Sequence, residues 1–244
     1  MMGSLLLALL LQQAAGEFMD VFGEMEAAGK AVKEADAAAA RFKEIFGVAP
    51  LRGAIVLTTD GKPAKDRTKD LAYAKNGAKW IWRWEAKKGA EPDETMAHEL
   101  GHLFLIFWIH GTTPPAPQYG SLLPDWLDEG VASLLECAAG HKGYAAEMRK
   151  RIAAETHLPL KDLFGCLHPD SREKSSKPKA KERWLFYAES WSVTAFLLER
   201  YGAKAMRHLV ATLKEGKSMD TAMGAQGLPK SVADLETAWK AWAK

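Results

Sequence analysis

The sequence has little that would hold it in a membrane or on nucleic acid. The apolar run from Leu5 to Leu11 is far too short to span a bilayer. Its net charge is only +2, from 33 Lys and Arg against 31 Asp and Glu. The densest basic run, residues 172–183, contains Ser and Pro and is expected to be a solvated loop. We therefore expect no nucleic-acid partner and no stable membrane insertion.

Cysteine is also scarce, since Cys137 and Cys166 are the only two. In an exported chain they could pair, closing a loop of about 30 residues and adding roughly 3 kcal/mol of stability. In the cytosol they would be two reduced, small core residues. The choice depends on where the chain resides.

Lys and Arg are absent from residues 1–16, yet this segment has other features of a secretory signal peptide. An apolar run is followed by small residues, with Ala14 and Gly16 before a cut at Glu17. The sequence thus predicts a signal peptide over 1–16 and a secreted, periplasmic or cell-envelope protein. If the segment is an ordinary helix start instead, the chain is cytoplasmic.

The remainder reads as one domain over 17–244, without internal repeats. We expect a helix over 17–47, a short strand over 54–58 and an alternating strand over 78–87. A helix over 93–110 is followed by a Pro-rich segment, 111–124, that excludes regular structure. Further helices are expected from 125 to a stop at Gly140, and over 144–155, 184–202, 203–215 and 231–244.

The clearest motif is His98-Glu99-Leu100-Gly101-His102, an H-E-x-x-H pattern. On a helix, positions i and i+4 share a face, so His98 and His102 can point at one ion. Glu99 is rotated by about 100° from His98, where it can take a proton from a zinc-activated water. The motif predicts two zinc ligands and a general base. The alternative is two histidines without a metal.

A catalytic zinc site usually has three protein ligands, so this motif lacks one. His110 lies about 80° off the face of His102 and is a poor candidate. The metzincin pattern would need Gly at 105 and His at 108, and is excluded by Leu105 and Trp108. The next helix offers four carboxylates: Asp125, Asp128, Glu129 and Glu136. Of these only Glu129 is followed by Gly, which would let two helices pack closely around one ion.

HELGH at 98–102 and PDWLDEGVASLLE at 124–136 together resemble the gluzincin zinc metallopeptidases, in particular the small peptidase MA-like domains. In that group the Glu of a W-L-x-E-G-x-A helix is the third ligand. The resemblance therefore implies one Zn²⁺ per chain, held by His98, His102 and Glu129, with Glu136 as structural support. It covers roughly residues 50–244, strongly over 96–136 and loosely elsewhere.

The resemblance also implies fold and activity. We expect an α+β, mostly helical, zincin-like fold with a thermolysin-type catalytic half and a small N-terminal β-sheet packed on the HExxH helix. The expected activity is hydrolysis of a peptide or protein substrate, with Glu99 as general base. Related gluzincins often stabilise the oxyanion with a tyrosine, and Tyr187 opens a matching helix. A buried structural role for Tyr187 is the alternative; weaker candidates are Tyr201, Tyr119 and His168.

The sequence departs from the aminopeptidase-type gluzincins in two ways. The gap between His102 and Glu129 is 26 residues, longer than in aminopeptidase-type gluzincins. No G-x-M-E-N segment precedes the histidines, so an aminopeptidase is unsupported. Two other functions remain: a zinc-stabilised binding or scaffold module without turnover, and an intracellular H-E-x-x-H regulator that cleaves a transcription factor. The latter usually has a DNA-binding module, and the sequence contains none that we recognise.

Overall fold

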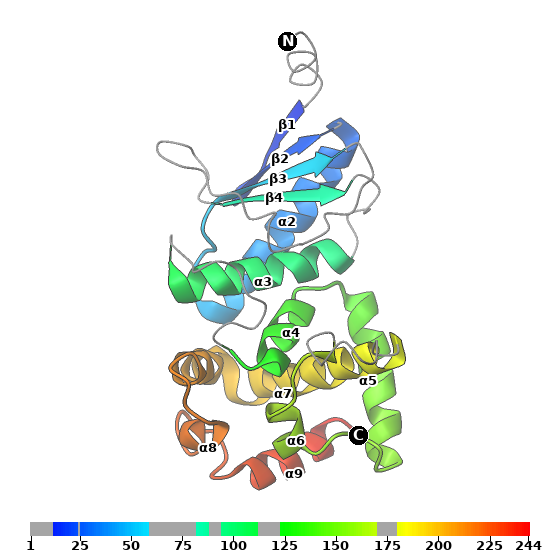
Figure 1. Ribbon diagram of the computed structural model, residues 1–244, viewed down its shortest axis with the longest axis vertical. Helices are drawn as coiled ribbons and strands as arrows, with labels where there is room; N and C mark the ends of the chain where they lie inside the picture. The colour runs from blue at the N-terminus through cyan, green and yellow to red at the C-terminus, as the bar shows by residue number, and fades with distance from the viewer. Residues whose placement is uncertain (1–11, 24, 59–81, 88–93, 112–122, 170–179) are drawn as a thin grey trace. The chain divides into compact units, whose positions relative to one another are not determined.

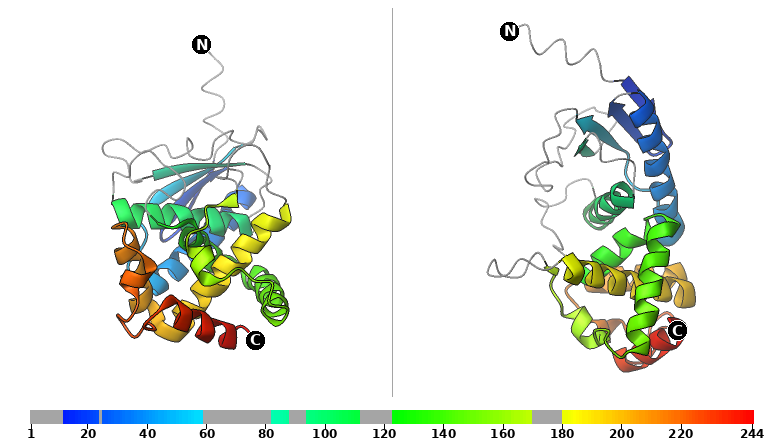
Figure 2. Two further views of the ribbon diagram at one scale, coloured as in Figure 1. Left: turned by 60° about the horizontal axis from the view of Figure 1, so that its bottom comes forward. Right: turned by 90° about the vertical axis from the view of Figure 1, so that its right-hand side faces the viewer.

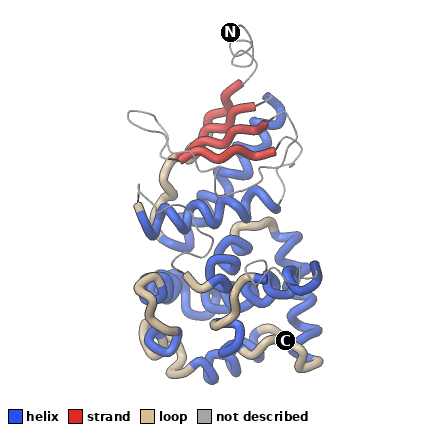
Figure 3. Tube along the Cα trace, in the orientation of Figure 1, coloured by secondary structure: helices blue, strands red, loops and turns tan. Residues whose placement is uncertain are grey.

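A computed structural model describes residues 12–23, 25–58, 82–87, 94–111, 123–169 and 180–244 (Figure 1). The chain forms two compact units, one drawn from residues 1–43 and 48–118, the other from 44–47 and 119–244. Helices predominate, and the described strands form one small sheet near the N-terminus (Figure 3). The α+β, mostly helical fold class is therefore confirmed.

The first unit contains a four-stranded sheet in the order β1-β2-β3-β4. Its strands are β1 (Gln12–Ala15), β2 (Met19–Gly23), β3 (Gly53–Thr58) and β4 (Trp82–Lys87). β1 is antiparallel to β2, and the other pairs are parallel, with Ile55 opposite both Val21 and Trp84. The strand predicted at 54–58 is confirmed. The one predicted at 78–87 is confirmed over 82–87, and its first four residues lie outside the described part.

Residues 19–23 form β2, so the helix predicted from residue 17 begins too early; α2 runs from Met25 to Phe46. Over so few residues, apolar spacing fits either a helix or a strand. Parallel pairing with β3 decides the outcome, because it buries Met19 and Val21 completely. Asp20, between them, is also buried, and its carboxylate accepts a hydrogen bond from Arg52 at 2.7 Å.

The turn between β1 and β2 is held from two sides. The Asp36 carboxylate of α2 accepts the backbone N–H groups of Glu17 at 2.8 Å and Phe18 at 2.9 Å. Arg52 donates to the carbonyl oxygen of Glu17 at 3.0 Å. The Gly16 N–H closes the turn on the Met19 carbonyl at 2.7 Å. Strand β1 is thereby fastened to both α2 and the start of β3.

Helix α2 covers one face of the sheet and carries the HExxH helix at its C-terminal end (Figure 2). Its buried residues are five alanines, two phenylalanines and one isoleucine: Ala28, Ala31, Ala35, Ala38, Ala39, Phe42, Ile45 and Phe46. The ring of Phe42 meets Phe104 edge-on at 5.6 Å and Trp108 at 6.5 Å. Both belong to α3 (Glu94–His110), which confirms the helix predicted at 93–110. This aromatic contact fixes α3 against α2.

The second unit is helical, and its core lies between α4 and α7. Its helices are α4 (Asp125–Leu134), α5 (Ala138–Ala153), α6 (Leu160–Phe164), α7 (Ala180–Leu213), α8 (Met219–Ala222) and α9 (Val232–Trp242). Within α7, Gly202 has φ 79° and ψ 173°, a conformation open to glycine, and there the two helices predicted at 184–202 and 203–215 meet. The Trp239 indole donates to the Ser192 hydroxyl at 3.0 Å, which ties α9 to α7.

Helix α4 ends at Leu134, six residues before the predicted stop at Gly140. The N–H groups of Leu135 and Glu136 bond three residues back, which tightens the last turn. The His141 ring then bonds the Ser133 carbonyl oxygen at 2.8 Å, so a side chain of α5 caps α4. Propensity alone could not locate this break, since the residues on both sides favour helix.

Cys137 and Cys166 are thiols that are not joined in a disulfide. Among the described residues, no helix has both the length and the apolar character needed to cross a membrane.

Candidate metal centre

Helix α3 presents His98 and His102 on one face. Their Nε2 atoms lie 3.2 Å apart, and the rings meet edge-on with centroids 4.9 Å apart. The side chains are buried, at 8% and 7% exposure. Two imidazoles so close and so little hydrated are a favourable pair of donors for a metal ion.

Glu99 follows His98 on the same helix and is partly exposed. The helical rotation of about 100° per residue turns it away from the direction of its neighbour. It is thus next to the histidine pair without being one of the potential metal ligands. Its role as general base stays a prediction.

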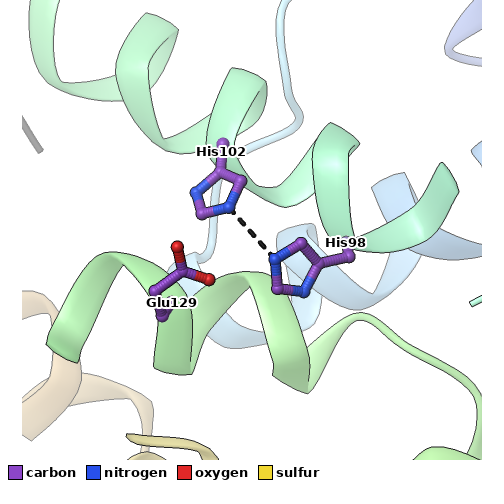
Figure 4. Close-up of side chains that lie close together, drawn as sticks. All are labelled: His98, His102 and Glu129. Carbon is purple, nitrogen blue, oxygen red and sulfur yellow. Dashed lines mark hydrogen bonds between the residues drawn. The ribbon is translucent and has the colours of Figure 1, made fainter. Parts of the chain in front are cut away.

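Glu129 lies on α4, whose residues from Trp126 to Leu134 are all buried. One ligand atom from each of His98, His102 and Glu129 lies within 4.8 Å of the others (Figure 4). Among the described residues, no other three His, Cys, Asp or Glu side chains gather in this way. The group consists of two imidazole nitrogens and one carboxylate, which is a donor set that zinc accepts.

A histidine of the second unit lies beside Glu129 and connects it to Tyr187. His168 Nε2 lies 3.4 Å from Glu129 Oε1 and 3.1 Å from the Tyr187 hydroxyl oxygen. The backbone N–H of His168 donates to Asp125 Oδ2 at 2.5 Å. The carboxylates of α4 and the hydroxyl of Tyr187 on α7 therefore meet at one histidine.

Gly130 explains how α7 comes so close to α4. A Cβ at this position would lie 2.6 Å from the carbonyl oxygen of Ser190 and would also overlap the Thr194 hydroxyl. Because the Ser190 carbonyl oxygen belongs to the backbone, no side-chain rotation would remove that obstacle. The Glu-Gly pair was expected to let two helices pack around one ion, but Gly130 instead allows a close approach of α7, which carries none of the three potential ligands.

The sequence from 68 to 244 matches the family model of the peptidase MA superfamily, which is most of the chain. The chain belongs to the peptidase MA superfamily. Among curated proteins, the comparison finds no match. Family membership confirms the resemblance carried by HELGH and WLDEG, and agrees with a zincin-like fold.

In this peptidase MA chain, the other carboxylates of the 125–136 segment and His110 lie outside the group of potential ligands. His110, Asp125, Asp128 and Glu136 are all described, and none belongs to the group of potential ligands. Asp125 binds the His168 backbone, and Glu136 Oε1 accepts from the Tyr144 hydroxyl at 3.4 Å, as a structural residue would.

Tyr201 is the one alternative tyrosine that the structure describes. Tyr119 lies outside the described residues. Tyr201 is 14 residues beyond Tyr187 on the same helical stretch of α7, so roughly 21 Å further along its axis. Its ring packs edge-on against Phe196 at 5.6 Å. Of the two candidate tyrosines that are described, Tyr187 is the one with a contact to His168, the neighbour of Glu129.

Burial perturbs two carboxyl groups around α4 and α7. It raises the pKa of Asp125, although the hydrogen bond from His168 works in the opposite direction. Burial also raises the pKa of Glu189 to about 7, against the lowering effects of the Leu158 N–H and the charge of Arg151. Glu189 Oε1 accepts that N–H at 2.7 Å.

Sequence reasoning gave His168 only as a remote oxyanion candidate and Asp125 only as a ligand candidate. Asp125 and Glu129 are four residues apart, so a shared helix face could have been noticed. Nothing in the local sequence around His168 indicates that its ring reaches Glu129, since that contact depends on how residues far apart in the chain fold together.

Proposed function

We propose that this chain is a zinc-dependent metallopeptidase of the gluzincin type, with His98, His102 and Glu129 as ligands of one Zn²⁺. The observation that carries the proposal is the buried group of two imidazoles and one carboxylate within 4.8 Å. Membership of the peptidase MA superfamily supports the same activity. A peptide or protein is then the substrate.

The spacing of the donors suits zinc. Two ligands of a tetrahedral zinc with bonds of about 2.0–2.1 Å lie roughly 3.3–3.4 Å apart. The Nε2 atoms of His98 and His102 are separated by 3.2 Å, close to that edge. The carboxylate of Glu129 is a suitable third donor, and three protein donors leave a fourth position open, as a catalytic site needs.

When bound, zinc supplies Lewis-acid activation of water and of the scissile carbonyl. Glu99 takes the proton of the attacking water and passes it to the departing amine. Its partly exposed position beside the ligand pair suits that task, because the carboxylate must reach both water and substrate. Tyr187 donates its hydroxyl proton in a hydrogen bond to the developing oxyanion.

Strand β4 is proposed to bind an extended substrate by adding a strand to the sheet. It stands at one end of the described sheet, and only β3 is paired with it there. Backbone hydrogen bonds of this kind recognise extended peptides largely independently of sequence. They would give the site a thermolysin-like arrangement of sheet and HExxH helix.

The test is Glu99→Gln, assayed with a broad library of quenched fluorescent peptides. We expect a loss of at least about 10²-fold in kcat/KM, since general-base catalysis typically contributes that much. Zinc content should stay near one per chain. Glu136→Gln is the matched control and should cleave like the wild type, because Glu136 contacts Tyr144.

Two outcomes would contradict the proposal. Full activity in Glu99→Gln would show that this carboxylate is not the base. One zinc per wild-type chain with no cleavage of any library member would favour a zinc-stabilised scaffold module instead.

The cellular location stays a prediction, as does a single peptidase domain over residues 17–244. A cut between Gly16 and Glu17 would sever the turn that Asp36 and Arg52 hold. The mass of the mature protein tests this directly. A chain beginning at Glu17 would support a secreted or cell-envelope protein, and a chain that retains Met1 would remove that argument.

A further inference from the structure

One buried histidine of the second unit touches two groups assigned to the proposed reaction. His168 is only 3% exposed. Its Nε2 faces the Tyr187 hydroxyl oxygen at 3.1 Å and Glu129 Oε1 at 3.4 Å. The rings of His168 and Tyr187 lie 5.7 Å apart at 31°, and the Phe186 ring meets the histidine edge-on. A single nitrogen thus links α4 to α7.

The two oxygens determine which tautomer fits. An ionised carboxylate can only accept, so a proton on Nε2 is favoured over a lone pair facing Glu129. The Nε2–H group then donates to Tyr187, and Glu129 Oε1 lies 3.4 Å from the same nitrogen. The hydroxyl proton of Tyr187 is directed away from His168, which is the orientation an oxyanion donor needs.

Helix α4 holds this histidine at two points. Asp125 and Glu129 are four residues apart and share a helix face. Asp125 Oδ2 accepts the backbone N–H of His168 at 2.5 Å, while Glu129 faces its ring. The backbone bond limits movement of the residue, so the ring stays opposite the carboxylate.

We propose that His168 is a positioning residue: it holds the Glu129 carboxylate in the orientation that a metal requires, and it holds the Tyr187 hydroxyl beside it. The inference rests on the proposed role of Glu129 as a ligand. Partners that orient a metal ligand typically contribute 10–100-fold to metal affinity. A hydrogen-bonding side chain of the right length should therefore replace His168, and an apolar or shorter one should not.

The experiment measures the zinc dissociation constant of the full chain by competition with a chromophoric chelator. Three variants differ in the donor they offer: His168→Gln, His168→Asn and His168→Leu. Gln carries its N–H₂ group near the position of Nε2, so we expect affinity within roughly threefold of wild type. Asn is too short and Leu has no donor, so both should bind zinc about 10–100-fold more weakly.

Cobalt substitution gives a second readout that stability alone would not change. The visible absorption of Co²⁺ reports the geometry of its ligands, so it should shift in His168→Asn and return toward wild type in His168→Gln. His157→Leu is the matched control. His157 faces Glu236 at 3.7 Å, a partly buried His–Glu pair of the same unit that is outside the group of potential ligands. Its loss should leave zinc affinity and the cobalt spectrum unchanged.

The outcomes separate this inference from the proposed function. If the wild type binds one zinc and His168→Asn binds it as tightly as His168→Gln, the positioning role is wrong and the metallopeptidase proposal survives. A loss of zinc affinity in His168→Asn that is no larger than in His157→Leu would likewise contradict the positioning role alone. If the wild-type chain binds no zinc, both proposals fail. Should His168→Leu not fold, the Asn and Gln pair still decides.

Discussion

The two helices of the candidate metal centre hold their side chains by different means. On α3, the four-residue spacing alone brings His98 and His102 to one face, with Nε2 atoms 3.2 Å apart. On α4, Glu129 has neighbours from elsewhere in the second unit: His168 faces its carboxylate, and α7 packs tightly on Gly130. The histidine pair is therefore a local feature of one helix, whereas the setting of the carboxylate is a tertiary one.

The largest expected effect comes from the histidine pair on α3. His98→Ala removes one of three proposed ligands, so we expect zinc affinity to fall by at least about 10³-fold and peptidase activity to disappear. Inductively coupled plasma mass spectrometry of the dialysed protein measures the zinc content. His110→Ala, at the end of the same helix and outside the ligand group, should keep one zinc per chain. One zinc per chain in His98→Ala would mean that the metal is bound elsewhere.

This contrast also explains how much of the site could be read from sequence. His98, Glu99 and His102 follow from the periodicity of a single helix, and α3 has nearly the bounds expected. Glu129 needed a family resemblance, because four carboxylates of the next helix were open. The roles of His168 and Asp125 were beyond reach, since a residue in a loop contacts a helix more than thirty positions earlier.

The second prediction tests whether the surroundings of Glu129 also contain a group that acts on the substrate. Tyr187→Phe removes the proposed oxyanion donor and keeps the ring. We expect kcat to fall by about 10²–10³-fold with KM and zinc content unchanged, because the donor acts in the transition state. Steady-state kinetics on a peptide found with the library measure both constants.

Tyr201→Phe is the control for this variant. It removes a hydroxyl roughly 21 Å further along α7 and should retain wild-type kcat. A kcat for Tyr187→Phe within threefold of wild type would instead assign Tyr187 a purely structural role beside His168.

The third prediction concerns a substitution that disturbs the packing beside Glu129. Gly130→Ala forces the helices apart, since the new Cβ would lie 2.6 Å from the Ser190 carbonyl oxygen. We expect the free energy of unfolding to fall by about 3 kcal/mol, the upper end for overpacking. Urea denaturation followed by circular dichroism measures it. Gly143→Ala, on α5 with nothing within 4 Å, is the control and should stabilise by about 0.5–1 kcal/mol. Equal stability of the two variants would contradict the close approach of α7.

The fold shows the same limit of sequence reasoning as the site. Strand β3 has a continuous apolar stretch and was expected where it lies. Strand β2 was assigned to a helix because Phe18, Val21, Phe22 and Met25 recur at helical spacing. Its conformation is decided by pairing with β3, some 34 residues later, and by Arg52, which neutralises the buried Asp20. The spacing of apolar residues within one segment gives no information about such distant partners.

The smallest expected effect concerns Glu189, which ties the segment before α6 to α7 through the Leu158 N–H. Burial raises its pKa from 4.5 to about 7. The folded chain therefore binds this proton more tightly than the unfolded chain does. As pH rises from about 4.5 to 7, the unfolded state loses the proton first and is favoured, so the contribution of Glu189 to stability declines.

Glu189→Gln should remove this decline, because a neutral amide can still accept the Leu158 N–H. We expect the variant to gain on the wild type between pH 4.5 and 7, by about 2 kcal/mol in the free energy of unfolding, and the gain to level off above pH 7. Urea denaturation at several pH values measures it. Glu26→Gln provides the contrast: the pKa of this exposed carboxyl is lowered by Lys30, so its loss should change stability with pH in the opposite sense. A gain for Glu189→Gln that does not depend on pH would mean that the pKa of Glu189 is the same in the folded and the unfolded chain, so that the folded chain carries the ionised group at neutral pH. The second unit would then bury a full charge beside the helix that supports Glu129, and Arg151, the cation that lowers the pKa of Glu189, would have to stabilise it.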